Sequence, residues 1–238
     1  MIPMRRRGIS WKNMEELKKH ELFEIEVLEK LKNAKFLFPL VFTGGTMLRL
    51  CHDMRRYSSD LDFWFIKKVN FNSYYKKLKD FLEKNYTLTD SQNKYFTLLF
   101  EFGSPEYPKK LKIEIRKRVE KVNFQEKIAY SPYTNKQVIL RCLSLEEMLK
   151  NKIDAFLDRK EIRDCFDIEF LLRQGIKINE KKEKLVKILK AIKKFKKNDY
   201  AVKLGSTLEP EMRKYYLKNK FSYLTQQINT ILSFQYGE

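Results

Sequence analysis

The chain has 238 residues, of which 43% are hydrophobic and 14% aromatic, so it can bury the core of one large domain or two small ones. Its formal net charge of +19, from 50 Lys and Arg against 31 Asp and Glu, is larger than solubility requires. This excess favours a polyanionic partner, nucleic acid before membrane. A lysine-rich surface can also arise without such a partner.

The cysteine and histidine content argues against several kinds of site. Cys51, Cys142 and Cys165 are scattered and odd in number, so we expect neither a disulfide framework nor a zinc site, and we infer a reducing compartment. His20 and His52 are the only histidines, which leaves little material for a His-based metal site or a Ser-His-Asp triad.

We expect neither a targeting segment nor a membrane span. Arg5, Arg6 and Arg7 resemble the start of a signal peptide, but no apolar stretch follows them. The longest apolar run, residues 36–42, is far too short to cross a bilayer. We therefore expect a cytoplasmic protein with no membrane partner.

The first predicted element is an amphipathic helix from Asn13 to about Asn33. Asn13 followed by Glu16 is typical of a helix N-terminus. The apolar residues fall at helical spacing, namely Leu17, Phe23, Val27, Leu28 and Leu31.

A strand, a glycine turn, a helix and a second strand are predicted next. Residues 36–43 indicate a strand that enters the pair Gly44-Gly45, and residues 46–52 indicate a short helix. Residues 61–66 then alternate large apolar side chains, as a half-buried strand does.

The rest of the chain changes character near residue 143. Before this point we predict a helix over 71–84 and strands over 86–89, 94–102, 111–119 and 137–142. After it, Ser144 and Glu147 form a capping-box pair, and nearly everything has helical periodicity. The predicted fold class is α+β, with a mixed-sheet domain at 1–143 and a helical domain at 144–238.

The tail from residue 177 onward carries much of the charge. It holds 15 Lys and Arg against 6 acids, a net of +9. Within it one helix has an apolar stripe of Leu185, Ile188, Leu189, Ile192 and Phe195, with lysines on the opposite face. This helix either follows nucleic-acid phosphates or is an ordinary surface helix docked on the core.

Two aspartates are the first candidates for chemistry. Asp60 and Asp62 alternate along a predicted strand, so both carboxylates point to one face, where they can share hard cations such as Mg²⁺. Taken alone the pattern is weak, because most such pairs are solvated.

The glycine pair lies where phosphates can bind. Gly44, Gly45 and Thr46 end a strand and open a helix, where backbone N–H groups and the helix dipole favour anions. A plain tight turn is the alternative. Because the turn and the aspartates lie on consecutive strands, one could hold a triphosphate whose metals the other binds.

Glu114 is the candidate for a third carboxylate, which two-metal sites normally use. It lies between Ile113 and Ile115 in a later strand, with Lys112 and Arg116 on its own face. A cross-strand ion pair is the alternative reading of a glutamate flanked by cations.

Four segments between residues 42 and 172 together resemble the AbiEii/AbiGii-type nucleotidyltransferases, which are toxins of type IV toxin–antitoxin systems in the DNA polymerase β-like superfamily. These segments are "GGTMLRL", the run from Arg56 to Phe63 that reads "RYSSDLDF", the strand around Glu114, and "KIDAFLDRKEIRDCFDIEFLL". The last segment contains Lys152, Arg159, Arg163, Asp164 and Asp167.

The resemblance implies a role for each matching residue and a polymerase β-like core. Asp60, Asp62 and Glu114 would bind two Mg²⁺ ions, with Mn²⁺ as an alternative, and Glu114 could instead be the base. Phosphate and nucleotide binding falls to Gly44, Gly45, Thr46, Arg56, Ser58, Lys152, Asp164 and Asp167, of which Lys152 neutralises the triphosphate. For Arg159, Arg163 and Asp167, structural ion pairing is an equal alternative.

The function implied is transfer of a nucleotide from an NTP to an acceptor hydroxyl, with release of pyrophosphate. MenT-type members add nucleotides to the 3′ end of tRNA, and the basic tail would suit such an acceptor. A toxin of this kind also implies a cognate antitoxin. Two alternatives stay open: a protein or small-molecule acceptor, and a non-catalytic nucleic-acid-binding protein on the same scaffold.

Overall fold

A computed structural model describes residues 11–236, and the side chains of residues 14–234. The chain divides into two compact units, Met1–Leu143 and Ser144–Glu238. The arginines at positions 5–7 lie outside the described residues. Among the residues that are described, no helix is both long and apolar enough to cross a membrane.

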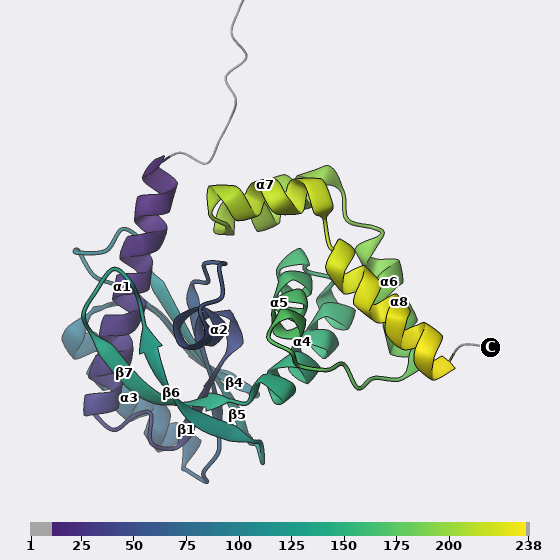
Figure 1. The fold of residues 1–238 in the computed structure, drawn as a ribbon. Coiled ribbons are helices and arrows are strands. Elements are labelled where there is room, and N and C mark those ends of the chain that lie inside the picture. Colours follow the sequence, from purple (N-terminus) through teal and green to yellow (C-terminus); the bar gives the residue numbers. More distant parts are fainter. Residues whose placement is uncertain (1–10, 237–238) are drawn as a thin grey trace, which may run out of the picture. The chain divides into compact units, whose positions relative to one another are not determined.

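A mixed sheet forms the centre of the first unit (Figure 1). Its strands are β1 (Leu40–Thr43), β2 (Asp60–Phe65), β3 (Thr87–Asn93), β4 (Thr97–Gly103), β5 (Leu111–Val119), β6 (Phe124–Tyr130) and β7 (Gln137–Leu143). Their spatial order is β3-β4-β5-β2-β1-β7-β6. β2 runs antiparallel to β1 and parallel to β5, while β1 is parallel to β7. The predicted mixed sheet is confirmed.

One face of this sheet is buried and the other is partly open. In β2, Leu61, Phe63 and Phe65 are buried, while the alternate side chains are partly exposed. The helices α1 (Trp11–Asn33) and α3 (Phe71–Asn85) cover the buried face. Phe23 of α1 packs edge-on against Phe102 of β4, and Tyr74 of α3 packs against Phe65.

Three predictions at the start of the chain need correction. The helix includes Trp11, so Asn13 lies inside it and is not its N-cap. The first strand is Leu40–Thr43, shorter than the predicted 36–43, because Pro39 has no N–H for a sheet ladder and the residues before it form turns. The helix after the glycine turn, α2, spans Gly44–His52 and so includes both glycines.

β6 was missed by the sequence analysis. Of its seven residues only Ala129 is buried, so the strand shows no clear alternation of apolar and polar residues. Its existence depends on its antiparallel pairing with β7, from Phe124↔Leu143 to Tyr130↔Gln137.

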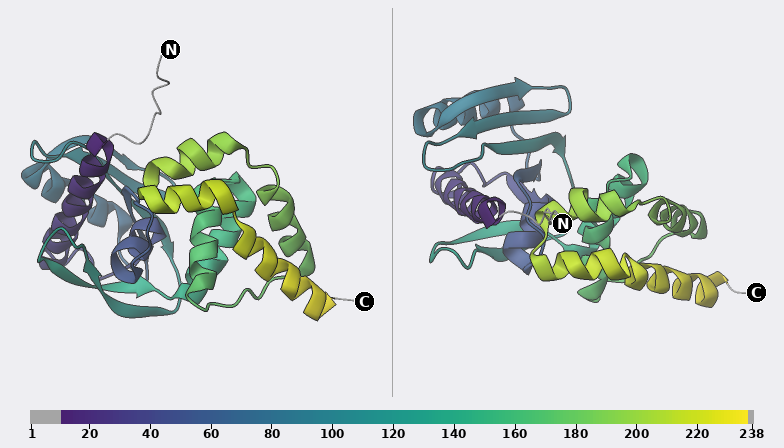
Figure 2. Two further views of the ribbon diagram at one scale, coloured as in Figure 1. Left: turned by 45° about the horizontal axis from the view of Figure 1, so that its top comes forward. Right: turned by 90° about the horizontal axis from the view of Figure 1, so that it is seen from above.

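The second unit is helical, as predicted (Figure 2, green to yellow). Its elements are α4 (Leu145–Arg159), α5 (Ile162–Arg173), α6 (Lys182–Ile192), a π-helix (Asp199–Leu204), a 3₁₀ turn (Gly205–Thr207), α7 (Pro210–Asn219) and α8 (Ser222–Tyr236). The Ser144 hydroxyl accepts a hydrogen bond from the Glu147 N–H and so caps α4, which confirms the predicted helix start. Aromatic rings of Phe166, Tyr200, Tyr216 and Phe221 form much of the core.

Candidate active site

Three carboxylates lie on the open face of the first unit's sheet. Asp60 and Asp62 alternate along β2, and the parallel register pairs Asp62 with Glu114 of β5. Residues paired across neighbouring strands project to the same side of a sheet. Asp60, Asp62 and Glu114 therefore share one face, and each is only partly buried.

Lys112 is the cation beside these carboxylates, and it pairs in register with Asp60. Its ammonium Nζ lies 2.8 Å from Glu114 Oε1 and 3.7 Å from Asp60 Oδ2. Partial burial opposes protonation, but the hydrogen bond to Glu114 and the charge of Asp60 hold the pKa of Lys112 above its ordinary value. Across the described residues, no three His, Cys, Asp or Glu side chains gather closely enough to hold a metal ion.

The glycine turn brings α2 against these strands. Gly44 has a φ of +79°, a conformation that favours glycine, and a Cβ atom there would collide with the Asp62 carboxylate. At Gly45 a Cβ atom would lie 2.6 Å from Arg56 Nη2 and 2.8 Å from Ser58 Oγ. Both glycines are therefore needed for close packing, and they bring Asp62, Arg56 and Ser58 to the N-terminus of α2.

The other residues near this turn have structural contacts of their own. The Thr46 hydroxyl is buried and donates a 2.7 Å hydrogen bond to the Asp60 carbonyl, which ties α2 to β2. Arg56 is buried, and its Nη1 donates to the Tyr57 carbonyl at 3.0 Å. Ser58 is partly exposed.

A buried polar cluster behind the site was missed by the sequence analysis. Arg49 of α2 donates a 2.8 Å hydrogen bond to Glu21 of α1, and its guanidinium stacks 4.4 Å from the centre of the Tyr57 ring. His20 Nε2 donates to the Ser59 carbonyl at 3.0 Å, directly before Asp60. The signal in the sequence was the polar run His20-Glu21, which interrupts the apolar face of the first helix.

Burial shifts the pKa of two residues of α1 in this region, His20 and Glu24. Burial lowers the pKa of His20, which favours the neutral imidazole. Burial and the neighbouring charge of Glu21 raise the pKa of Glu24 well above its ordinary value. His20 and Glu24 approach each other to 3.5 Å, between Nε2 and Oε1. Burial thus favours the neutral forms of His20 and Glu24, while Arg49 and Glu21 form a buried ion pair.

In the second unit, Lys152 joins an ion-pair network between α4 and α5. Its side chain is 8% exposed, and its Nζ lies 2.7 Å from Asp167 Oδ2 and 3.4 Å from Asp164 Oδ1. Arg159 donates two hydrogen bonds of 2.6 Å to Asp164. Burial opposes ionisation of Asp164, but Arg159 and Lys152 together keep its pKa below the ordinary value. Arg163, the fifth residue of the same motif, is exposed.

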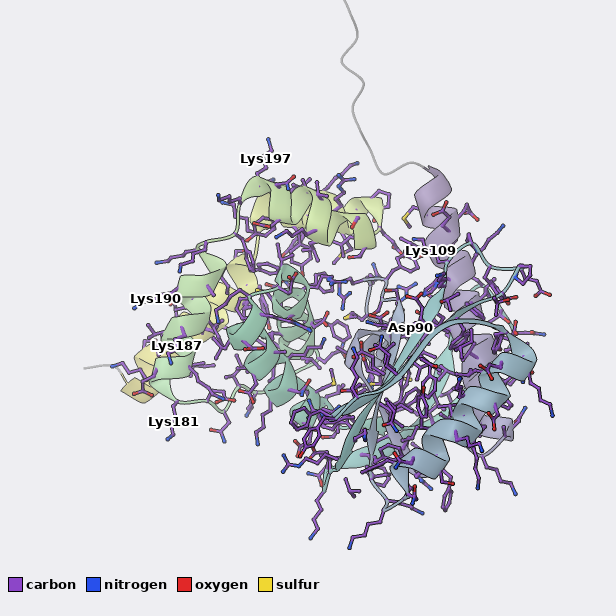
Figure 3. The ribbon with its side chains drawn as sticks, turned by 180° about the vertical axis from the view of Figure 1, so that it is seen from behind. Asp90, Lys109, Lys181, Lys187, Lys190 and Lys197 are labelled. Carbon is purple, nitrogen blue, oxygen red and sulfur yellow. The ribbon has the colours of Figure 1, made fainter. Side chains whose placement is uncertain are left out.

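Four lysines on and beside α6 point away from the second unit. The apolar side of α6 is buried through Leu185, Ile188 and Ile192. Lys187 and Lys190 of this helix project outward, as do Lys181 before it and Lys197 after it (Figure 3). The helix is therefore docked on its own unit and also presents a basic outer surface.

Comparisons with known proteins identify the family. A model of the family described as nucleotidyl transferase AbiEii toxin, Type IV TA system, matches residues 26–226, well over half of the chain. Among curated proteins, no sequence matches significantly.

Two solved structures are similar to the chain. JHP933 from Helicobacter pylori is 22% identical and has a TM-score of 0.50, with 96% of each chain covered. MenT4, a nucleotidyltransferase toxin from Mycobacterium tuberculosis, is 14% identical and has a TM-score of 0.49, with 88% of each chain covered. The similarity to JHP933 shows a shared fold. The match to the family model is a sequence match over most of the chain, and it identifies the family. The chain belongs to the AbiEii family of nucleotidyltransferase toxins of type IV toxin–antitoxin systems.

Proposed function

We propose that this nucleotidyltransferase transfers a nucleoside monophosphate from an NTP to the 3′ end of a tRNA in a Mg²⁺-dependent reaction in the cytoplasm. The observation that carries the proposal is the register of β2 and β5, which pairs Asp62 with Glu114 beside Asp60 on one open face. The glycine turn lies directly against Asp62. The turn that we propose to bind phosphate is thus adjacent to the carboxylates.

The carboxylate oxygens of Asp60, Asp62 and Glu114 are the donor type that Mg²⁺ prefers. They do not form a closed cluster in the described structure, so the three side chains would have to draw together around the ion. They already attract the ammonium group of Lys112, so a cation is favoured there. Bound Mg²⁺, or Mn²⁺ in its place, would offset the charge of the triphosphate and acidify the acceptor hydroxyl; two ions are expected.

In the proposed reaction a carboxylate of this face takes the proton from the acceptor hydroxyl, and Glu114 has this role where it is not the third metal ligand. The oxygen attacks the α-phosphate in line, and the bond between this phosphate and the leaving pyrophosphate breaks. The N-terminus of α2 at Gly44 and Gly45 offers N–H groups to phosphate oxygens. Thr46, Arg56 and Ser58 are proposed to shape this phosphate site.

We further propose that Lys152, Asp164 and Asp167 bind the nucleotide and that Lys152 neutralises charge on the triphosphate. Their support is the family motif together with the buried ion pairs that fix the lysine. Because Lys152 is paired with two aspartates, its loss would also destabilise the second unit. Its role in catalysis must therefore be measured on variants that are shown to be folded.

The tRNA acceptor is proposed on the basis of charge. The tail from residue 177 has a net charge of +9, and its lysines project outward from α6 and its flanks. Such a surface suits RNA phosphates, and binding through it should weaken steeply as salt rises. Membership of a toxin–antitoxin family further implies an antitoxin as a partner.

The test is incubation of the purified protein with Mg²⁺, each α-³²P-labelled NTP and total RNA. We expect label in a tRNA-sized band with wild type and none with Asp60→Asn or Asp62→Asn. Asp90→Asn is the matched control, because Asp90 is an exposed aspartate on β3 of the same sheet (Figure 3). Label on protein or a small molecule would replace the tRNA proposal. RNA binding without transfer would indicate a non-catalytic binding protein.

A further inference from the structure

The open face of the sheet continues beyond the carboxylates into an aromatic and basic surface. Trp64 follows Asp60 and Asp62 on the same side of β2 and is only partly buried. Its register partner is Arg116 of β5, whose guanidinium lies 4.6 Å from the centre of the indole ring. Arg116 in turn pairs with Thr97 of β4. A flat aromatic–cation pair therefore lies next to the Asp62–Glu114 pair.

The hairpin between β3 and β4 carries two further aromatic rings. Tyr95 is 84% exposed and Phe96 is 74% exposed, and they contact each other edge-on at 4.5 Å. The hairpin is held in place because Lys117 Nζ donates to Asn93 Oδ1 and to the Lys94 carbonyl, each at 2.9 Å. The two adjoining exposed rings form an apolar patch, and exposed apolar patches mark interaction sites.

Several cations lie close to this hairpin. Lys94 precedes the two rings, and Arg116 and Arg118 alternate along β5 on the side of Trp64, whereas Lys117 points to the α3 side, 6.0 Å from the centre of the Phe71 ring. Glu120 approaches Arg116 to 3.6 Å and Arg118 to 3.7 Å. Aromatic rings among cations are the composition that binds single-stranded nucleic acid, because bases stack on the rings while the cations meet phosphates.

Strand geometry relates this surface to the carboxylates. Two residues along a strand span about 6.6 Å, so Trp64 lies about that far from Asp62 along β2. This is comparable to the distance between a ribose hydroxyl and the base of the same nucleotide. The direction across the strands, from Trp64 through Arg116 to Thr97, leads toward the hairpin.

The geometry points to a stacking surface, made of Trp64, Arg116, Tyr95 and Phe96, that binds the unpaired bases at the 3′ end of the acceptor RNA. The terminal base lies on Trp64, and the preceding bases continue toward Tyr95 and Phe96. This inference rests on the proposed transfer to RNA and adds where the single strand lies. It does not depend on the basic tail.

The experiment uses tryptophan fluorescence, because the chain has only two tryptophans, Trp11 and Trp64. In Trp11→Phe, Trp64 is the only indole. Titration with a short RNA duplex that has an unpaired 3′ overhang should quench its emission, because a stacked base quenches indole. The same duplex with blunt ends should quench it far less. If Trp11→Phe does not fold, the difference in quenching between wild type and Trp64→Phe gives the same information.

Affinity provides a second readout. The double variant Tyr95→Ala, Phe96→Ala should bind the overhang more weakly, by roughly 5- to 150-fold for each stacked base that is lost. Tyr130→Ala is the matched control, because this tyrosine is 49% exposed on β6, at the sheet edge opposite β3, and this variant should bind as wild type does.

These binding measurements separate the stacking surface from the proposed reaction. Asp62→Asn should lose transfer and keep the quenching. Unchanged Trp64 emission, or wild-type affinity in the double variant, would overturn the stacking surface even if nucleotide transfer to tRNA is observed.

Discussion

Gly44→Ala is the sharpest test of the site, because it adds one methyl group where the structure has no room. Gly44 has a φ of +79°, and the new Cβ would meet the Asp62 carboxylate. Gly175→Ala is the matched control. It has a similar φ of +84°, but a Cβ atom there would have nothing within 4 Å. The difference between the two variants isolates the collision with Asp62 from backbone strain.

The expected magnitudes follow from these two contributions. A left-handed conformation costs alanine about 1–2 kcal/mol, and the stiffer unfolded chain offsets part of this. Gly175→Ala should therefore lose about 1 kcal/mol of unfolding free energy, or about 2–4 °C in Tm. Gly44→Ala adds about 1–3 kcal/mol of overpacking. Displacing the Asp62 carboxylate by about 1 Å should also lower kcat about a hundredfold.

Thermal unfolding and transfer of α-³²P label are measured on both variants. We expect Gly175→Ala to be modestly destabilised and fully active, and Gly44→Ala to be folded at the assay temperature but nearly inactive. Equal activity of the two variants would refute the reasoning, because the glycine turn would then have no influence on the position of Asp62.

Three further predictions concern buried or paired charges. Glu24→Gln should stabilise the protein more at pH 8 than at pH 5. Because the pKa of Glu24 is raised in the folded state, the unfolding free energy of wild type falls as the pH rises above the ordinary pKa of glutamate, by up to about 1.4 kcal/mol per pH unit. An equal change in unfolding free energy at both pH values would contradict this. Lys112→Met should tighten Mn²⁺ binding about fivefold by electron paramagnetic resonance, since it removes about 1 kcal/mol of charge repulsion; weaker binding would show that Lys112 does not compete with metal. Lys152→Ala should lose about 3–5 kcal/mol of unfolding free energy in urea denaturation, because Asp164 and Asp167 stay buried without their lysine. A loss below about 1 kcal/mol would mean that water reaches and solvates the two aspartates in the variant.

The sequence by itself determined the features that depend on local periodicity. Alternation along residues 61–66 predicted a strand, and the spacing of Asp60 and Asp62 predicted that both carboxylates share one face. In the structure β2 spans Asp60–Phe65, with both aspartates on its less buried face. Ser144 and Glu147 predicted the start of α4, because a capping box involves only residues within one helical turn. The order of the motifs also sufficed to predict the family, which the family model confirms.

Only the tertiary structure decided which distant residues meet. β6 exists because β7 pairs with it, and its own sequence lacks a buried face. The contacts of Arg49 with Glu21, of His20 with the Ser59 carbonyl, and of Lys112 with Asp60 join separate elements. Strand register and burial depend on the packing of the whole unit, whereas sequence periodicity reports only on neighbours along the chain. For this reason the sequence could predict the carboxylates and place Lys112 on the face of Glu114, while the approach of Lys112 to Asp60 and the buried supports required the fold.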